Sequence, residues 1–410
     1  MPREGSIDVL VVGSGAAGLA ASVSAVSAGA RVALATKTTL QANNSSKAQG
    51  GIQAALGADD SPDLHADDVF RSSHDSADRE LVSVLTTEAP SAIAWLEELG
   101  CAFTRHSVIG GPSGRRGGYR LARCGGASRK RLLQVGDRTG HAITKALRAQ
   151  HEGGDAETLA HHRLEALERR GAGWRASFAT PDGVRTVSAG AVVLASGGRC
   201  YAEAGLRGEL STNHPNATGE TTRIACDAGA EARDLDALQY HPNGGAWPAT
   251  MQGYSIPETT RSYGAVLLNA DGEEFTDSLG PRDEVSQAIF DEVEAGRGVA
   301  TADGRPAVLL DTTRISASDA EVSLPYMLRR YRGAGIDPLS EPLLTYPVLH
   351  YQNGGLVIDT RAETTLEGLF ACGEIAGGTH GRNRMMGNSL LECVVFGRRA
   401  GAAAAEQARS

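Results

Sequence analysis

The chain has 410 residues and a formal net charge of −9, which is long enough for two or more domains with sizeable cores. The charges are mixed in sign, with 40 Lys and Arg against 49 Asp and Glu, and this balance argues against nucleic acid as a partner. Six scattered cysteines form no Cys-x-x-Cys pair, so we expect reduced thiols, a cytoplasmic location and no metal site. We expect no signal peptide and no membrane span.

A short motif near the start of the chain gives the clearest local signal. The apolar run that begins at Asp8 predicts a buried strand, which leads into Gly-x-Gly-x-x-Gly at 13–18 and then into a helix. Gly13 allows a tight turn, Gly15 lets the backbone approach a pyrophosphate, and Gly18 lets the helix pack on the strand. The helix N-terminus favours phosphate. The motif predicts dinucleotide binding, with a chance glycine-rich turn as the alternative.

The next two segments extend this unit. Residues 30–35 predict a second strand, which ends in Thr36 and Lys37 where dinucleotide folds often place a ribose-binding acid. The polar run over 43–49 ends in the pair Gly50-Gly51. A glycine pair suits a backbone that passes close to a ligand, although an ordinary surface turn would use the same residues.

Helices and a hairpin are expected in the middle of the chain. Residues 61–100 predict two helices. A third helix is expected from about 139 to 149, with Asp137 or Thr139 as its N-cap. The turn signal at 181–183 predicts a β-hairpin.

Two later segments return to the strand-and-glycine character of the start. Residues 191–198 predict a buried strand that returns to the nucleotide domain, and residues 366–374 repeat this pattern. A final helix is expected to start in the segment from Asn388, with Asn388 or Ser389 as its N-cap. No second nicotinamide motif is present, so the electron donor or acceptor is expected to come from outside the chain.

Composition divides the chain into two parts. Aromatic, proline and turn residues become more frequent over 238–351, which predicts an inserted second domain. We therefore expect an α/β fold with a discontinuous Rossmann-like domain formed by 1–237 and 352–410.

Several short motifs together resemble those of one family. From about Asp8 to Ala402 the chain resembles the flavoprotein group that contains L-aspartate oxidase and the flavoprotein subunits of succinate dehydrogenase and fumarate reductase. The resemblance implies a FAD-binding domain with an inserted α+β capping domain. The matching segments, in this order, are Gln49-Gly50-Gly51, Asp137-Arg138-Thr139-Gly140, Gln239-Tyr240-His241-Pro242, Gly280-Pro281-Arg282-Asp283, His350-Tyr351 and His380-Gly381-Arg382-Asn383-Arg384.

The resemblance implies that FAD is the cofactor. Glu374 matches an acid that holds ribityl or ribose hydroxyls, a task that suits a carboxylate; a surface acid at a strand end is the alternative. Asn44 stands where many relatives carry the histidine that bonds FAD covalently, so non-covalent FAD is expected. The cofactor-binding residues implied are Gly13, Gly15, Ala16, Ala17, Gly18, Thr36, Lys37, Ser45, Gln49, Gly50, Gly51, Gly197, Glu374, Ser389 and Leu390.

The resemblance also implies a dicarboxylate site. Arg384 matches an arginine that grips a carboxylate, and His241 and His350 match two substrate-binding histidines, although a histidine is more often structural. Arg282 matches an arginine that transfers a proton. Because free guanidinium holds its proton too tightly for an ordinary base, this role needs a relay. Glu258 and Arg261 match the relay positions, with a surface ion pair as the alternative.

Three positions depart from the family pattern. Cys124 stands where aspartate oxidase has a glutamate that senses the substrate amino group, and this places it among the expected substrate-binding residues. Pro257 and Asn243 each stand where relatives place a threonine. We therefore expect plain L-aspartate to be a poor or modest substrate and a modified or larger relative to be preferred. Cys124→Glu is expected to raise activity on L-aspartate relative to the preferred substrate.

The first interpretation is a FAD-dependent oxidase or dehydrogenase of L-aspartate or a related amino-dicarboxylate, with hydride moving from a substrate carbon to flavin N5. The electron acceptor is expected to be O₂ or a small molecule. A fumarate reductase or succinate dehydrogenase type of enzyme and a non-catalytic flavin-binding protein are the alternatives. The chain ends without the C-terminal helical domain of these relatives, so no iron–sulfur partner subunit is expected.

Overall fold

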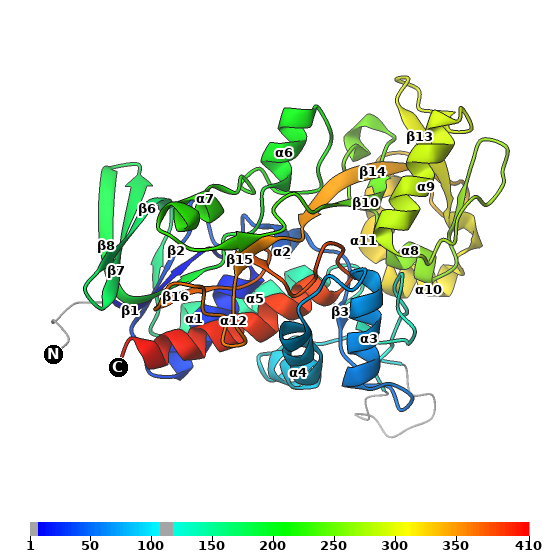
Figure 1. The fold of residues 1–410 in the computed structure, drawn as a ribbon. Helices are drawn as coiled ribbons and strands as arrows, with labels where there is room; N and C mark the ends of the chain where they lie inside the picture. The colour runs from blue at the N-terminus through cyan, green and yellow to red at the C-terminus, as the bar shows by residue number, and fades with distance from the viewer. Residues whose placement is uncertain (1–6, 107–117, 410) are drawn as a thin grey trace.

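The structure, a computed structural model, describes residues 7–106 and 118–409 (Figure 1). Its largest sheet has seven strands: six follow the order β5-β2-β1-β8-β7-β6, and the seventh, β16, pairs with β8. Strand β1 pairs in parallel with both β2 and β8, which is the expected βαβ arrangement. The bounds are β1 Ile7–Val12, β2 Val32–Ala35, β5 Glu157–Leu159, β6 Arg163–Arg170, β7 Gly173–Thr180, β8 Gly183–Leu194 and β16 Leu369–Ala371.

Helix α1 (Ala16–Ser27) follows β1 and packs against the last helix, α12 (Asn388–Gln407). Both helices are rich in small residues, and this lets their backbones approach closely. A Cβ atom on Gly401 would lie 2.1 Å from the carbonyl oxygen of Ala21. A larger residue at this contact would force the two helices apart. The C-terminal helix thus packs into the same core as the first strand and α1.

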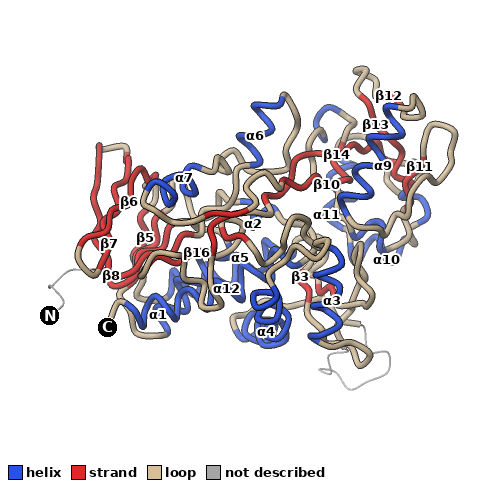
Figure 2. The backbone as a smooth tube through the Cα atoms, viewed as in Figure 1, coloured by secondary structure: helices blue, strands red, loops and turns tan. Residues whose placement is uncertain are grey.

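A second, antiparallel sheet lies at the other end of the molecule (Figure 2). Its order is β10-β14-β13-β11, with β12 paired to β13. Figure 1 shows β14 reaching from this sheet toward the middle of the molecule. The sheet has a separate apolar cluster that includes Leu267, Ile289, Leu310 and Met327. The bounds are β10 Leu238–Gly245, β11 Val266–Leu268, β12 Val299–Ala300, β13 Pro306–Asp311 and β14 Leu343–Gln352.

The second sheet carries several of the remaining helices, and two small sheets lie elsewhere. The division of the chain into domains stays a prediction. The helices around the second sheet are α8 Thr259–Ser262, α9 Arg282–Glu294, α10 Ala317–Ser323 and α11 Pro325–Gly333, with 3₁₀ turns at Ala249–Met251 and Thr312–Arg314. The small sheets are β3 Ile52–Gln53 with β4 Leu132–Leu133, and β9 Ala232–Arg233 with β15 Gly355–Val357 and β17 Ala376–Gly377.

The predicted helices and the hairpin are present, but the predicted helix caps are wrong. Asp137 does not cap α5; its two carboxylate oxygens accept hydrogen bonds from the backbone N–H groups of Tyr326 (2.9 Å) and Met327 (2.6 Å). It therefore holds the first turn of α11, which local sequence patterns cannot indicate. Helix α12 is preceded by Gly387, with φ of 87°, and Asn388 is its first residue. The other helices are α2 Asn44–Lys47, α3 Pro62–Ser72, α4 Arg79–Glu98, α5 Thr139–Gly153, α6 Cys200–Arg207 and α7 Glu220–Asp227.

Across residues 7–106 and 118–409, no helix combines the length and the apolar character that crossing a membrane requires.

Candidate active site

Two adjoining cavities run from the glycine motif to the second sheet. The first, called the nucleotide cavity, lies beside the turn between β1 and α1. The second, called the central cavity, has a volume of about 620 Å³ and reaches β10 and β14. Asn44, Ser45, Glu374 and Cys393 line both cavities. The two cavities therefore adjoin at these residues, and an adjoining pair suits an extended ligand such as FAD.

The glycine motif forms the wall of the nucleotide cavity. Gly13 has φ of +119°, and a Cβ atom there would lie 2.3 Å from the carbonyl oxygen of Ala195. The turn is therefore closed to other residues, and it leaves the N-terminus of α1 facing the cavity. Of the predicted cofactor residues, Ala16 and Gly18 lie behind this wall within α1. Those that line the nucleotide cavity are Gly13, Gly15, Ala17, Thr36, Lys37, Ser45, Gly197 and Glu374.

The central cavity contains the remaining predicted cofactor residues. Gln49, Gly50, Gly51, Ser389 and Leu390 all line it. The side-chain amide of Gln49 donates to the carbonyl oxygen of Ser255 (2.9 Å). This hydrogen bond joins the segment before the glycine pair to the loop that follows β10. The N-terminus of α12 faces the same space and favours negative charge there.

Glu374 lies where the two cavities meet. Its Oε1 accepts a hydrogen bond from the backbone N–H of Gln352 (3.0 Å), and burial raises the pKa of its carboxyl to about 7. A buried acceptor at this junction fits the hydroxyl groups of the chain that joins a flavin ring to its nucleotide. The residues of both cavities therefore fit FAD.

We predict that Glu374 makes the apoprotein less stable as the pH rises. Its pKa is about 7 in the folded chain and about 4.5 in the unfolded chain, so the folded state holds the extra proton between these values. The free energy of unfolding should fall by about 3 kcal/mol from pH 4.5 to pH 7 because of this group. The free energy of unfolding by denaturant, measured against pH, should fall in the native apoprotein and not in Glu374→Gln apoprotein. The same pH dependence in both proteins would contradict the prediction.

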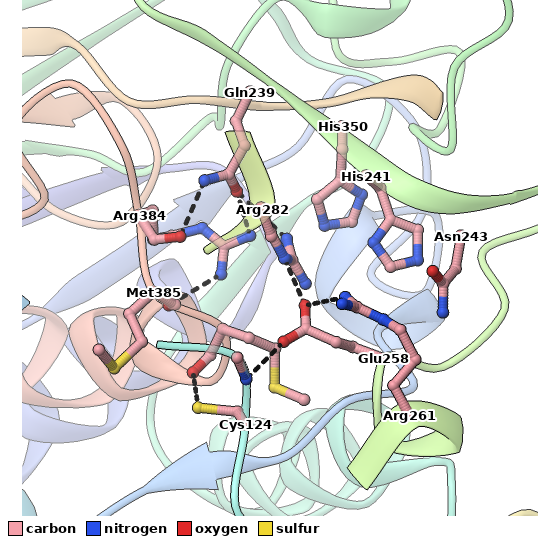
Figure 3. A network of polar contacts seen from close by, with 12 residues as sticks. Cys124, Gln239, His241, Asn243, Glu258, Arg261, Arg282, His350, Arg384 and Met385 are labelled. Atoms are coloured by element: carbon pink, nitrogen blue, oxygen red, sulfur yellow. Dashed lines mark hydrogen bonds and ion pairs between the residues drawn. The ribbon is translucent and has the colours of Figure 1, made fainter. Parts of the chain in front are cut away.

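Two buried arginines meet at the far end of the central cavity (Figure 3). Arg282 is the first residue of α9, and Arg384 lies in the loop before α12. Both donate to Oε1 of Gln239, from Nη1 of Arg282 (3.2 Å) and Nη2 of Arg384 (3.1 Å). Burial and the charge of Arg282 lower the pKa of Arg384 to about 10, so it stays cationic at neutral pH. The end of the cavity is strongly positive.

Glu258 joins Arg282 to Arg261. Its Oε2 accepts from Nε of Arg282 at 2.6 Å and lies 3.6 Å from Nη2 of Arg261. Burial by itself would raise the pKa of Glu258, but the charges of Arg282 and Arg261 outweigh it and lower the pKa to about 2. Glu258 lines the cavity, whereas Arg261 lies behind it and donates to the carbonyl oxygen of Ser278. The predicted relay residues are thus in contact and fully buried, which excludes a surface ion pair.

The two predicted histidines lie side by side on neighbouring strands. His241 of β10 and His350 of β14 both line the cavity, and their ring centroids are 5.0 Å apart. Burial and the charge of Arg282 lower the pKa of His241 to about 3, and burial lowers that of His350 well below its usual value. Both rings are therefore neutral. Nε2 of His241 donates to the carbonyl oxygen of Ile256 (2.8 Å), which leaves Nδ1 as an acceptor.

Gln239 is a site residue to which the sequence motifs assign no role of its own. It occupies β10 two positions before His241, and both side chains reach the site. Tyr240, between them, points elsewhere and donates to Glu209 (2.8 Å). The sequence could have indicated Gln239 through its spacing from His241, because residues two apart on a strand share one face.

Cys124 does not line either cavity, contrary to its expected place among the substrate-binding residues. Its thiol is buried against the carbonyl oxygen of Met386 (3.6 Å), and burial raises its pKa to about 12. The following residue, Gly125, donates its backbone N–H to Oε1 of Glu258 (3.1 Å). Cys124 thus supports the wall that holds Glu258, and its thiol is not placed to contact a substrate amino group. Pro257, by contrast, lines the central cavity.

We therefore predict that Cys124→Glu destabilises the protein and does not improve turnover of L-aspartate. The new carboxylate would be buried near Glu258 in a cluster with Met385 and Met386. Overpacking and like charge should cost about 2–4 kcal/mol of unfolding free energy. Thermal unfolding of Cys124→Glu, with Cys124→Ser as the matched control, checks this result. A stable Cys124→Glu protein with raised activity on L-aspartate would instead place position 124 in contact with substrate.

Comparisons with known proteins agree with this site. A family described as FAD binding domain matches residues 8–390. The chain is 36% identical to L-aspartate oxidase of Streptomyces coelicolor, over 96% of this chain and 67% of the relative. It is 31% identical to the flavoprotein subunit of fumarate reductase from Haemophilus influenzae, over 98% of this chain and 69% of the relative.

A solved quinol fumarate reductase of E. coli has the same fold. It superposes with a TM-score of 0.89 at 29% identity, over 99% of this chain and 71% of that chain. Together with the cavity that fits FAD, these matches assign the cofactor and the class of enzyme. The chain belongs to the FAD-binding family that contains L-aspartate oxidases and fumarate reductase flavoproteins, and it is a FAD-dependent oxidoreductase.

Proposed function

We propose that the protein oxidises or reduces a dicarboxylate, with L-aspartate or a related amino-dicarboxylate as the first candidate substrate. The observation that carries this proposal is the pair Arg282 and Arg384, which meet at Gln239 in one cavity. Two buried guanidinium groups at this spacing suit an anion with more than one negative oxygen. Bound FAD would supply the redox step by taking up or returning a hydride.

The chain's own residues bind and orient the substrate. Arg384 lies with its guanidinium carbon 4.3 Å from the centroid of the Tyr351 ring, so its planar fork is held flat and can face a carboxylate. Holding the reacting carbon in one place supplies much of the rate acceleration in a reaction of this kind. Arg384 is therefore assigned to substrate binding.

Arg282 is assigned to proton transfer. Nε donates to Glu258 and Nη1 donates one hydrogen bond to Gln239, so Nη2 and the second N–H of Nη1 can face substrate. The ionised carboxylate of Glu258 contacts both Arg282 and Arg261. A proton lost at Arg282 could thus be replaced along this line of buried groups, which meets the requirement that an arginine act through a relay.

One observation favours an amino-dicarboxylate. Nδ1 of neutral His241 is a buried acceptor without a hydrogen-bond partner among residues 7–106 and 118–409. A substrate amino group that reached this nitrogen would donate a hydrogen bond to it, whereas a carboxylate would not. The second candidate, a fumarate reductase type of reaction, is supported by the proton relay at Arg282, because reduction of a carbon–carbon double bond needs a proton donor.

An anaerobic flavin-bleaching screen over dicarboxylates and amino acids tests the proposal. Bleaching by L-aspartate or a relative, with peroxide released when air is admitted, supports the first candidate and O₂ as acceptor. Reoxidation of the chemically reduced flavin by fumarate supports the second. No reaction with any dicarboxylate in either direction would overturn both. The cytoplasmic location and the independence from an iron–sulfur subunit stay predictions.

We predict that FAD is bound without a covalent link. Asn44 lines both cavities, and its amide is engaged by Asn213 (2.7 Å) and by the backbone N–H of His214 (2.6 Å). A carboxamide cannot form the bond that a histidine ring would form with a flavin. Acid precipitation of the purified yellow protein should leave the flavin in the supernatant. Flavin that stays with the precipitated polypeptide would contradict the prediction.

A further inference from the structure

Gln239 lies between the two arginines of the site. Its Oε1 accepts a hydrogen bond from each guanidinium, and the residue is 3% exposed. The two cations are thus held together by an uncharged acceptor (Figure 3). Like charges repel at this range, so the shared oxygen offsets part of the cost of bringing them together.

The orientation of the Gln239 amide is fixed. Its Nε2 donates to Oδ1 of Asn383 (2.8 Å) and to the backbone carbonyl oxygen of Arg384 (2.8 Å). A backbone carbonyl only accepts, so the nitrogen must face it and the oxygen must face the arginines.

Asn383 extends this network to the base of α9. Its Nδ2 donates to Oδ1 of Asp283 (2.7 Å) and to the carbonyl oxygen of Ser72 (2.8 Å). Asp283 directly follows Arg282, and Asn383 directly precedes Arg384. The hydrogen bonds among Gln239, Asn383 and Asp283 therefore connect the two chain segments that carry the arginines. Gln239 is therefore held from one end while it holds two arginines with the other.

The neutrality of Gln239 has an electrostatic consequence. Arg282 is already paired with Glu258 at 2.6 Å, whereas Arg384 has no carboxylate partner among the residues that the structure describes. An amide oxygen orients both guanidinium groups without cancelling their charge. A carboxylate in the same place would neutralise one of them, and the end of the cavity would lose its attraction for a dianion.

We infer that Gln239 is a positioning residue that selects for doubly charged ligands by keeping Arg384 and Arg282 together without neutralising them. This inference rests on the proposed function and deepens it, because it names the residue that sets the charge of the preferred substrate. A negative charge at position 239 would repel each carboxylate of a ligand, so by Coulomb's law it would weaken binding of a dianion more than binding of a monoanion.

The test measures binding of two probes to the FAD-loaded protein by perturbation of the flavin spectrum. Succinate carries two negative charges, and succinamate has the same length with one of them replaced by an amide. In Gln239→Glu the carboxylate stays ionised between two arginines. The Kd should rise by about tenfold for succinamate and about a hundredfold for succinate, because the interaction energy scales with ligand charge.

Gln239→Met separates charge from position. It removes the shared acceptor and adds no charge, so both Kd values should rise by the same factor and their ratio should not change. Gln287→Glu is the charge control: it adds the same charge on an exposed face of α9, where Gln287 donates to Asp291 (2.8 Å). Both Kd values should there stay within twofold of those of the native protein.

Several results would overturn this inference or its basis. Equal weakening of both probes in Gln239→Glu would make the residue merely structural. Unchanged Kd values for both probes in Gln239→Glu would show that Gln239 does not influence ligand binding. If Gln239→Glu fails to retain FAD, Gln239→Met decides, and unchanged Kd values there would refute the positioning role. Failure of the native protein to bind either probe would instead overturn the proposed dicarboxylate function itself.

Discussion

Replacing Arg282 with glutamine should lower kcat by about 10²- to 10⁴-fold, the range that a positioned acid or base contributes. The change removes a proton-bearing group that contacts Gln239 and Glu258 at once. It should leave FAD bound, because Arg282 lies at the far end of the central cavity and does not line the nucleotide cavity, where the glycine motif lies. Single-turnover reduction of the flavin, measured by stopped flow, gives the rate of this step without interference from the oxidising half-reaction.

Two controls make this result specific. Arg282→Lys keeps the charge beside Glu258 but loses the planar fork, so it should recover part of the rate. The FAD content of both variants, measured from the flavin absorbance, should equal that of the native protein. Turnover of Arg282→Gln within tenfold of native would remove the assignment of proton transfer to Arg282.

Replacing Arg384 with leucine should act mainly on substrate binding. Removal of one partner of a buried charge pair costs about 2–5 kcal/mol, which corresponds to a rise in Kd of about 30-fold to several thousand-fold. Arg384 suits this role because its charge is available to a ligand and the face of the Tyr351 ring holds it in place. Titration of the flavin spectrum with succinate measures the effect directly.

The comparison with Arg384→Lys shows whether the fork itself matters. A lysine would keep the charge but not the bidentate geometry, so its Kd should fall between those of the native protein and Arg384→Leu. In both variants the first-order rate at saturating substrate should change less than in Arg282→Gln. A large loss of rate with an unchanged Kd would reverse the roles of the two arginines.

Local signals in the sequence were sufficient for the first half of the architecture. The glycine motif at 13–18 predicted the βαβ unit because a tight turn between a buried strand and a helix leaves few alternatives. The apolar run at 191–198 predicted a buried strand of the nucleotide domain, and this segment forms the end of β8, which pairs in parallel with β1. Such elements are determined by residues close in sequence.

The caps and the accessory site residues depended on contacts between distant segments. Asp137 precedes a helix and has the right chemistry for a cap, yet it binds the first turn of α11, far along the chain. Cys124 sits in a motif position that suggested contact with substrate, yet its backbone neighbour holds Glu258 while the thiol is buried. Spacing along the chain does not show which side of a wall a residue occupies.

The sequence by itself determined the cofactor motif, the types of residue at the dicarboxylate site and the family. Tertiary structure decided how these residues share their charges. Gln239, Glu258, Arg282 and Arg384 come from four separate segments, and only folding brings them within hydrogen-bond distance. The charge that a ligand meets is the sum over these neighbours, because buried charges interact strongly across a few ångströms and no local pattern records that sum.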